Sequence, residues 1–354
     1  MVITMLDELR NQIREVDASI AELIARRLDL ARRIGEEKVK LGLPVRDFAT
    51  EKRVLETMDR HAERLGIDRE ILEGVVLQLI RGSVQLQSRN RVPLHSRGNL
   101  RAAVIGGDGH MGKWFEGFLS SRGYDVIIIE KDDDLRLSLE SDLIVVSVPL
   151  DRTGEVLRRI AGENPRGIII EVASLKSDFV DQIPEWIESG MRIACIHPMF
   201  GAEADLLAGQ NLIVCESGCK EAEDAAADLF SDSAVHVVRI PLADHDRIMA
   251  WVLNLPHLLN LLAADLLSAS TEDHERLREF GGTTFNRQHA VTSEVVSENP
   301  DLYYHIQHIN RHRGEFFNHF RESLQRIIGV IERNDREAFV KQMNGWSRWF
   351  RGER

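Results

Sequence analysis

A glycine-rich turn between an apolar strand and a helix is the first stretch whose residue types and spacing could do chemistry. Residues 102–105 are apolar, and Gly107, Gly109 and Gly112 follow them in the order Gly-x-Gly-x-x-Gly. In such a turn the first glycine permits the bend, the second lets the backbone approach a pyrophosphate, and the third lets helix and strand pack closely. The phosphates would lie at the positive N-terminus of the helix. The pattern predicts a dinucleotide-binding turn.

The next predicted strand supports this interpretation. Residues 125–129 form a second predicted strand, which is apolar from Val126 onward and ends at Glu130. An acid about 20 residues beyond the glycine turn is placed to bind a ribose hydroxyl. A third buried run, 142–148, then ends at Pro149. We therefore favour a dinucleotide site over an ordinary turn between a strand and a helix.

A second candidate set consists of cations near the N-terminus. A long helix is predicted there by apolar residues at spacings of three and four, namely Leu6, Leu9, Ile13, Val16, Ile20, Leu23, Leu30 and Ile34. The position that should continue this apolar seam after Leu23 is Arg27, and Lys38 lies three turns further on nearly the same face. A cation in an apolar seam is costly unless an anion meets it. The pattern indicates an anion site, or else a helical dimerisation module with snorkelling arginines.

Arg10 constrains how such a site could be built. It precedes Arg27 by 17 positions, which is about 25 Å along a helix that rises ~1.5 Å per residue. One small dianion cannot contact both side chains of one chain. If both serve one site, Arg10 must come from a partner chain, so this pattern favours a homodimer.

Three kinds of segment must position these residues. We predict a multidomain chain with an all-α module at 1–92, a linker at 93–99, an α/β doubly wound domain at 100–246, and an all-α region at 247–354. The second segment alternates apolar runs with helical or loop stretches, as a parallel sheet requires. In the last segment Trp346, Trp349 and Phe350 recur at helical spacing and are expected in the core.

Composition limits the possible partners. The net charge of −12 argues against a nucleic-acid-binding protein, and three cysteines are too few for a disulfide framework. We expect no apolar run near the ~18 residues of a membrane span, and an amphipathic N-terminal helix rather than a signal peptide. These features predict a soluble, cytoplasmic protein without a membrane or nucleic-acid partner.

The first segment resembles the all-helical chorismate mutases. The resemblance rests on separated motifs, which are Leu9-Arg10, Asp17, Arg26-Arg27, Gly35, Lys38, Pro44-Val-Arg-Asp47, Glu51 and Ser83-Val-Gln-Leu-Gln87. It implies an intertwined dimer in which Arg10 of one chain joins Arg27, Lys38, Arg46 and Ser83 of the other around the carboxylates of chorismate. Lys38 and Gln87 would donate hydrogen bonds to the ether oxygen, while Asp47 and Glu51 would hold the ring hydroxyl. Thr50 departs from the family, whose members often have arginine there.

The ends of the predicted strands carry a second resemblance. Residues 147–149, 173–176 and 197–201 follow apolar runs, where ligands of doubly wound sheets bind. Together with the glycine turn and Asp244-His-Asp246, they resemble prephenate dehydrogenases. By that resemblance His197 would accept the C4 hydroxyl proton of prephenate, and Ser147 would hold the hydroxyl or the nicotinamide. The order of the two modules is that of the enzymes in which both activities are fused.

The same resemblance implies the cofactor. NAD would lie on the turn formed by Gly107, Asp108, Gly109, His110, Met111 and Gly112, with Glu130 on the adenosine ribose. An acid at that position repels a 2′-phosphate and favours NAD over NADP. The helical C-terminal region would dimerise and close one wall of the substrate site.

The position expected to bind the substrate carboxylate matches the prephenate dehydrogenases least well. Glu294 stands where family members commonly carry arginine, and Arg287 is the nearby cation that could substitute. His257 is a further candidate for ligand binding in this region. Four histidines, 305, 308, 312 and 319, lack an acid or cysteine to complete a metal set, so no metal is expected. An arogenate or other hydroxy-acid dehydrogenase with a structural helical module stays open, as does a dinucleotide-sensing dimeric regulator.

Overall fold

The computed structural model describes residues 2–41, 43, 47–88, 100–204 and 207–353. It divides into two compact units. The first comprises Met1–Ser174 and Asp181–Leu242, and the second comprises Leu175–Val180 and Ala243–Arg354. Arg46 and the linker at 93–99 lie outside the described residues.

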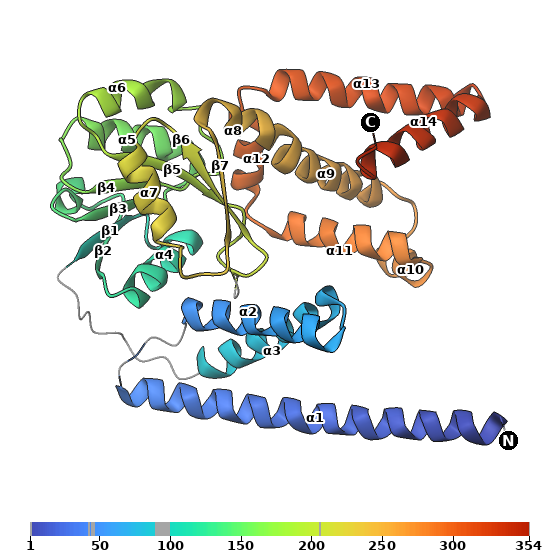
Figure 1. Ribbon diagram of the computed structural model, residues 1–354. Coiled ribbons are helices and arrows are strands. Elements are labelled where there is room, and N and C mark those ends of the chain that lie inside the picture. The colour runs from blue at the N-terminus through green and yellow to red at the C-terminus, as the bar shows by residue number, and fades with distance from the viewer. Residues whose placement is uncertain (1, 42, 44–46, 89–99, 205–206, 354) are drawn as a thin grey trace. The chain divides into compact units, whose positions relative to one another are not determined.

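Three helices open the first unit, as the apolar periodicity predicts. They are α1 (Val2–Leu41), α2 (Phe48–Leu65) and α3 (Arg69–Ser88). Asp47 caps α2 by accepting a hydrogen bond from the Thr50 backbone N–H at 2.9 Å, which satisfies a donor that the first helical turn leaves open. Helix α3 packs against both α1 and α2 (Figure 1). By contrast, most of the apolar seam of α1 faces outward, and Leu23 is 63% exposed.

A seven-stranded sheet forms the rest of the first unit, in the order β2-β1-β3-β4-β5-β6-β7. Its strands are β1 (Arg101–Ile105), β2 (Asp125–Ile129), β3 (Leu143–Val146), β4 (Ile168–Glu171), β5 (Ile193–Pro198), β6 (Asn211–Glu216) and β7 (His236–Pro241). The first five are parallel, which confirms the doubly wound prediction, whereas β6 runs antiparallel to β5. The helices of this domain are α4 (His110–Ser121), α5 (Thr153–Ala161), α6 (Ile183–Glu188) and α7 (Lys220–Asp228) (Figure 1).

The second unit is helical, as predicted. Its elements are α8 (Leu242–Met249), a π-helical turn (Ala250–Asn254), α9 (Leu255–Ser268), α10 (His274–Glu279), α11 (Thr283–Ser297), α12 (Pro300–Ile309), α13 (Arg313–Glu332) and α14 (Arg336–Phe350). The prediction that the aromatic residues of α14 are core is wrong for the single chain, since Trp349 is 73% and Phe350 81% exposed. Their helical spacing is real, but no described element covers that face.

Asp246 ties the segment Leu175–Val180 to the helices of the second unit. Its carboxylate accepts hydrogen bonds from the backbone N–H of Lys176, at 3.0 and 3.1 Å, and from the hydroxyl of Ser177. His245 Nδ1 lies 2.6 Å from the same carboxylate. Burial opposes ionisation of Asp246, but these hydrogen bonds hold its pKa below the usual value. The carboxylate therefore stays charged and keeps the segment in place.

One helical run in the described chain is long and apolar enough to span a membrane by composition, Leu242–Ser268. The sequence expectation of no such run was therefore wrong. Length and apolar composition alone are weak support for a span, because helices of soluble proteins also have them. The run contains the π-helical turn, and α9 packs against α11 within the same unit.

Candidate active sites

Two glycines of the turn stand where a side chain would not fit. A β-carbon on Gly107 would lie 2.5 Å from the side chain of Ile128, and one on Gly112 would overlap the carbonyl oxygen of Gly106. Helix α4 starts at His110, directly after Gly109. Gly107 thus lets the turn pack against β2, and Gly112 lets α4 pack against the turn. Binding of a pyrophosphate at the first N–H groups of α4 stays a prediction.

The bend itself falls one residue earlier than the pattern indicates. Gly106, rather than Gly107, has the left-handed φ of +83°, and a β-carbon there would lie 2.5 Å from the carbonyl oxygen of Ser147. The assignment of the bend to Gly107 is therefore wrong. Because Gly107 has an ordinary φ, its lack of a side chain serves only the close approach of β2.

Glu130 lies against this turn. Its carboxylate accepts a hydrogen bond from the backbone N–H of Asp108 at 2.7 Å, and its own N–H donates to Asp133 at 2.8 Å. The carboxylate at the end of β2 is thus placed beside the residues that would hold the pyrophosphate. The role of Glu130 in binding the ribose stays a prediction.

Two polar side chains stand at the carboxyl ends of nearby strands. Ser147 follows β3, is half-buried, and its N–H donates to the carbonyl of Ile105 at 2.9 Å. His197 lies near the end of β5 and is only 4% exposed. Strand β4 separates the two strands, so both residues belong to the edge of the sheet where ligands of this fold bind.

In the helical module, Arg27 contacts Ser83, and the resemblance assigns both residues to the substrate carboxylates. The guanidinium Nη1 donates to the Ser83 hydroxyl and to the Leu79 carbonyl, both at 2.7 Å. Burial lowers the pKa of Arg27, but an arginine remains charged. The helices therefore hold a fixed cation between α1 and α3, where an apolar residue would otherwise pack.

Lys38, Asp47 and Glu51 form the other end of this candidate site. Burial lowers the pKa of Lys38, while the charges of Asp47 and Glu51 oppose that shift. Burial would raise the pKa of Asp47, but hydrogen bonds from Thr50 and the charges of Lys38 and Arg53 hold it below its usual value. A cation and two acids from two different helices thus interact at the start of α2.

Thr50 stands where family members often have arginine, but Arg53 brings a guanidinium to this end of the candidate site. Its hydroxyl lies 2.7 Å from Oδ2 of Asp47, and Nη2 of Arg53 lies 2.7 Å from that hydroxyl. Arg53 is three residues further along the helix and was not singled out from the sequence. The local spacing of three could have revealed it, because residues three apart share one helix face.

Three other residues, Arg10, Gln87 and Arg46, are predicted in the mutase site. Arg10 is exposed and pairs with Asp7 at 3.4 Å. Gln87 belongs to α3, but its side chain lies outside the described residues, as does all of Arg46. Arg10 and Arg27 do not share a pocket in this chain, so the role of Arg10 stays a prediction that requires a partner.

Helices of the second unit carry the other candidates. Burial lowers the pKa of His257 to about 4, and its buried Nδ1 has no hydrogen-bond partner among the described residues. The His257 ring lies 4.6 Å from that of Tyr303. Arg287 and Glu294 are both exposed on α11. In the described part of the chain, no group of three or more His, Cys, Asp or Glu residues is arranged to hold a metal.

Known families match this division of the chain. Residues 9–88 match chorismate mutase type II, residues 119–239 the nucleotide-binding domain of prephenate dehydrogenase, and residues 241–345 its dimerisation domain. The T-protein of Enterobacter agglomerans is 24% identical over 353 residues, which cover 99% of this chain and 94% of that protein. The chain belongs to the bifunctional chorismate mutase–prephenate dehydrogenase family.

Other relatives of this bifunctional family match single modules. The chorismate mutase of Methanocaldococcus jannaschii is 32% identical over 88 residues, which cover 25% of this chain and 89% of that protein. A crystal structure of prephenate dehydrogenase from A. aeolicus, in complex with hydroxyphenyl propionate and NAD+, has a TM-score of 0.56 at 18% identity. It covers 72% of this chain and 98% of its own. A Synechocystis arogenate dehydrogenase has a TM-score of 0.54 at 18% identity, over 71% of this chain and 100% of its own. At such identity these structures show the shared fold.

Proposed function

We propose that the chain converts chorismate to prephenate and then oxidises prephenate with NAD to 4-hydroxyphenylpyruvate and CO₂, two steps of tyrosine biosynthesis. The observation that carries this proposal is that one chain holds both kinds of site. A half-buried Arg27 is fixed on Ser83 in the helical module, and a glycine turn that is closely packed at Gly107 and Gly112 lies beside Glu130 in the sheet domain. The product of the first site is the substrate of the second.

The first reaction needs position and charge rather than a nucleophile. Chorismate rearranges in one pericyclic step, so a protein accelerates it by holding the reactive conformer and by donating to the ether oxygen as that oxygen gains charge. Arg27 and Ser83 would bind a carboxylate, and Lys38 with Gln87 would donate to the ether oxygen. Asp47 and Glu51 would hold the ring hydroxyl. Arg46 and Arg10 of a partner chain would complete the cations.

The second reaction needs a base and a hydride acceptor. NAD, when bound, accepts the hydride from C4 of prephenate. Two observations support a fit of this chain to NAD: Gly107 and Gly112 allow the close packing of the turn with β2 and α4, and the Glu130 carboxylate, which would bind the ribose, lies against that turn. His197 would take the proton of the C4 hydroxyl, and Ser147 would orient that hydroxyl or the nicotinamide. The ring then loses CO₂ and becomes aromatic.

Two molecules of the chain would form the working enzyme. The outward apolar seam of α1 and the exposed aromatic residues of α14 both need a cover, and residues 241–345 match a dimerisation domain. A homodimer would also supply Arg10 to the site that contains Arg27. Arg287 and His257 would contribute to substrate binding in the second unit. We place this dimer in the cytoplasm, with chorismate and prephenate as its small-molecule partners.

Replacing His197 tests the second half of the proposal. His197→Asn keeps a polar side chain but removes the base, so NADH formation from prephenate should fall by about 10²-fold or more. Chorismate consumption by the same variant, measured without NAD, should stay within a factor of two of the wild type. Undiminished NADH formation from prephenate would refute the role of His197.

A further inference from the structure

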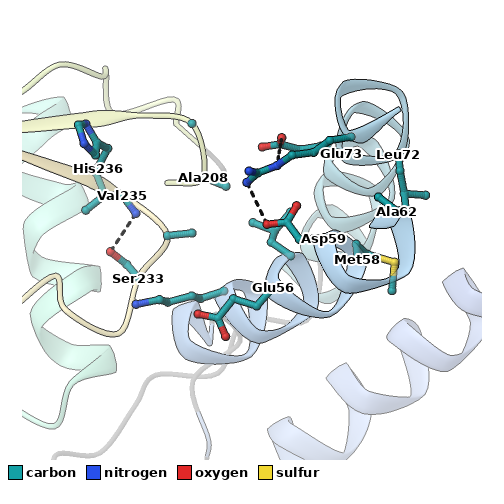
Figure 2. A pocket seen from close by; sticks show the side chains of 15 residues that line it. Glu56, Met58, Asp59, Ala62, Leu72, Glu73, Ala208, Ser233, Val235 and His236 are labelled. Atoms are coloured by element: carbon teal, nitrogen blue, oxygen red, sulfur yellow. Dashed lines mark hydrogen bonds and ion pairs between the residues drawn. The ribbon is translucent and has the colours of Figure 1, made fainter. Parts of the chain in front are cut away.

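One face of α2 lies along the dinucleotide-binding domain. Phe48 is 6% exposed and belongs to the core of that domain. One turn further on, the Lys52 ammonium donates to the carbonyl of Ser231 at 3.1 Å. Glu56 and Asp59 then line a cavity of about 300 Å³, shared with residues that include Ser233 and His236 (Figure 2). The spacing of these α2 residues is that of one helix face, so one face of α2 lies against the dinucleotide-binding domain. Arg69, Leu72 and Glu73 of α3 line the same cavity.

Phe48 anchors this face in a cluster of aromatic rings. Its ring meets Phe118 of α4 edge-on, with centroids 5.5 Å apart and planes at 64°. Phe118 stacks on Trp114 at 4.9 Å, and Trp114 lies 5.3 Å from Phe200. Edge-on and stacked rings have preferred geometries, and such close packing resists displacement. The start of α2 is therefore held by the helix that begins at the glycine turn.

The residue before Phe48 is Asp47, whose carboxylate caps α2 and interacts with Lys38. Asp47 is the acid to which we assign the ring hydroxyl of chorismate. Because adjacent residues share a peptide bond, a backbone shift at Phe48 that follows loss of the ring contact would move Asp47 as well. Arg27 and Ser83, at the other end of the candidate site, are held by α1 and α3 instead.

We propose that Phe48 is a positioning residue for the mutase site, and that the dinucleotide-binding domain thereby sets the place of Asp47. This inference rests on the proposed function, because it assumes that Asp47 binds chorismate. The rearrangement requires both ends of the substrate to be held at once, and a displacement of about 1 Å can cost up to 10²-fold in rate. A mutation in the domain of the second reaction should then impair the first.

Two substitutions on opposite sides of the ring contact test the proposal in the full-length protein. Phe48→Ala removes the anchor, and Phe118→Leu removes its partner ring on α4. Each should lower mutase kcat/KM by about tenfold, chiefly through a higher KM for chorismate, because the hydroxyl contact forms before the reaction. The double variant should lose little more than the worse single variant, since both break one interaction. Phe48→Leu, which keeps most of the apolar volume, should recover much of the loss.

Trp186→Leu is the matched control. It also removes a buried aromatic ring from the dinucleotide-binding domain, but Trp186 lies outside the aromatic cluster, so mutase KM should not change. Circular dichroism and NADH formation from supplied prephenate establish that each variant is folded.

If the Phe48→Ala and Phe118→Leu variants are folded and keep wild-type kcat and KM for chorismate, the positioning role of Phe48 is refuted, while the proposed function stands. A rise in KM of the same size in Trp186→Leu would also overturn it, because the effect would then be general destabilisation. A wild-type protein that does not consume chorismate would instead overturn the proposed function, and this inference with it.

Discussion

Arg27 of α1 donates to the hydroxyl of Ser83 on α3 at 2.7 Å, although 56 positions separate the two residues in the chain. The same guanidinium nitrogen donates to the Leu79 carbonyl. An arginine that is half-buried in an apolar seam and held on a second helix is fixed before any ligand arrives. Preorganised charge of this kind is what a unimolecular rearrangement with charge development requires.

Arg27→Ala should therefore abolish chorismate consumption, with a loss of about 10²-fold or more in kcat/KM, because a fixed, partly desolvated cation is removed. NADH formation from supplied prephenate should persist, because the residues assigned to the dehydrogenase lie outside the helical module. Arg32→Ala is the matched control, since Arg32 is on the same helix but makes only exposed ion pairs with Asp29 and Glu36, which contribute little. Loss of both activities in Arg27→Ala would indicate structural collapse instead.

The shared site can be tested by mixing inactive chains. If Arg10 of one chain serves the pocket that contains Arg27 of the other, a dimer of an Arg10→Ala chain and an Arg27→Ala chain has one intact site. Refolding the two variants together at equal concentrations should then restore mutase activity to about a quarter of the wild-type value, because half of the dimers are mixed and each has one intact site of two. If the mixture is no more active than the separate variants, both arginines serve a site within one chain, or Arg10 serves none.

The glycine turn makes a steric prediction. Gly112→Ala should raise the KM for NAD by about tenfold or more and destabilise the domain by about 1–3 kcal/mol, because the new methyl overlaps the Gly106 carbonyl. Gly117→Ala is the control on the same helix, with no atom within 4 Å of its added methyl. It should leave the KM for NAD unchanged and, by helix propensity, stabilise α4 by up to about 1 kcal/mol. Steady-state kinetics and thermal unfolding measure both effects; equal effects of the two substitutions would contradict the steric account.

Much of the fold and of the candidate sites could be predicted from the sequence, because the signals lie within single elements or pairs of adjacent elements. Arg27 stood out because a 3.6-residue period predicts an apolar residue at its position. Glu130 was found because a parallel strand of fixed length returns the chain to the glycine turn. Both depend only on the geometry of one element or of two adjacent ones.

What the sequence did not reveal depends on contacts between distant segments. Gly106 has a left-handed φ beside Ser147, but a run of two glycines does not say which one bends. Phe48 looked like an ordinary apolar residue, and only its place against Phe118 gives it significance. The exposure of Trp349 and Phe350 could not be predicted either, because periodicity does not distinguish a face that meets its own chain from one that does not.

His257 gives the stability a defined pH dependence. Burial lowers its pKa from 6.5 to about 4, so the folded protein favours the neutral ring. That contribution is complete above pH 6.5 and is lost as the pH falls from 6.5 towards 4, because the unfolded chain takes up the proton first. In urea unfolding at pH 7 and pH 4.5, His257→Leu should lose less stability between the two pH values than the wild type does. An equal or larger loss in the variant would show that His257 does not contribute.

The central claim is that one chain carries out both reactions in sequence. The most direct measurement mixes the purified protein with chorismate and NAD alone and follows NADH by its absorbance. The account predicts NADH formation after a lag in which prephenate accumulates, and no NADH from the same mixture with the Arg27→Ala variant unless prephenate is supplied. A wild-type protein that forms NADH from added prephenate but none from chorismate would contradict it.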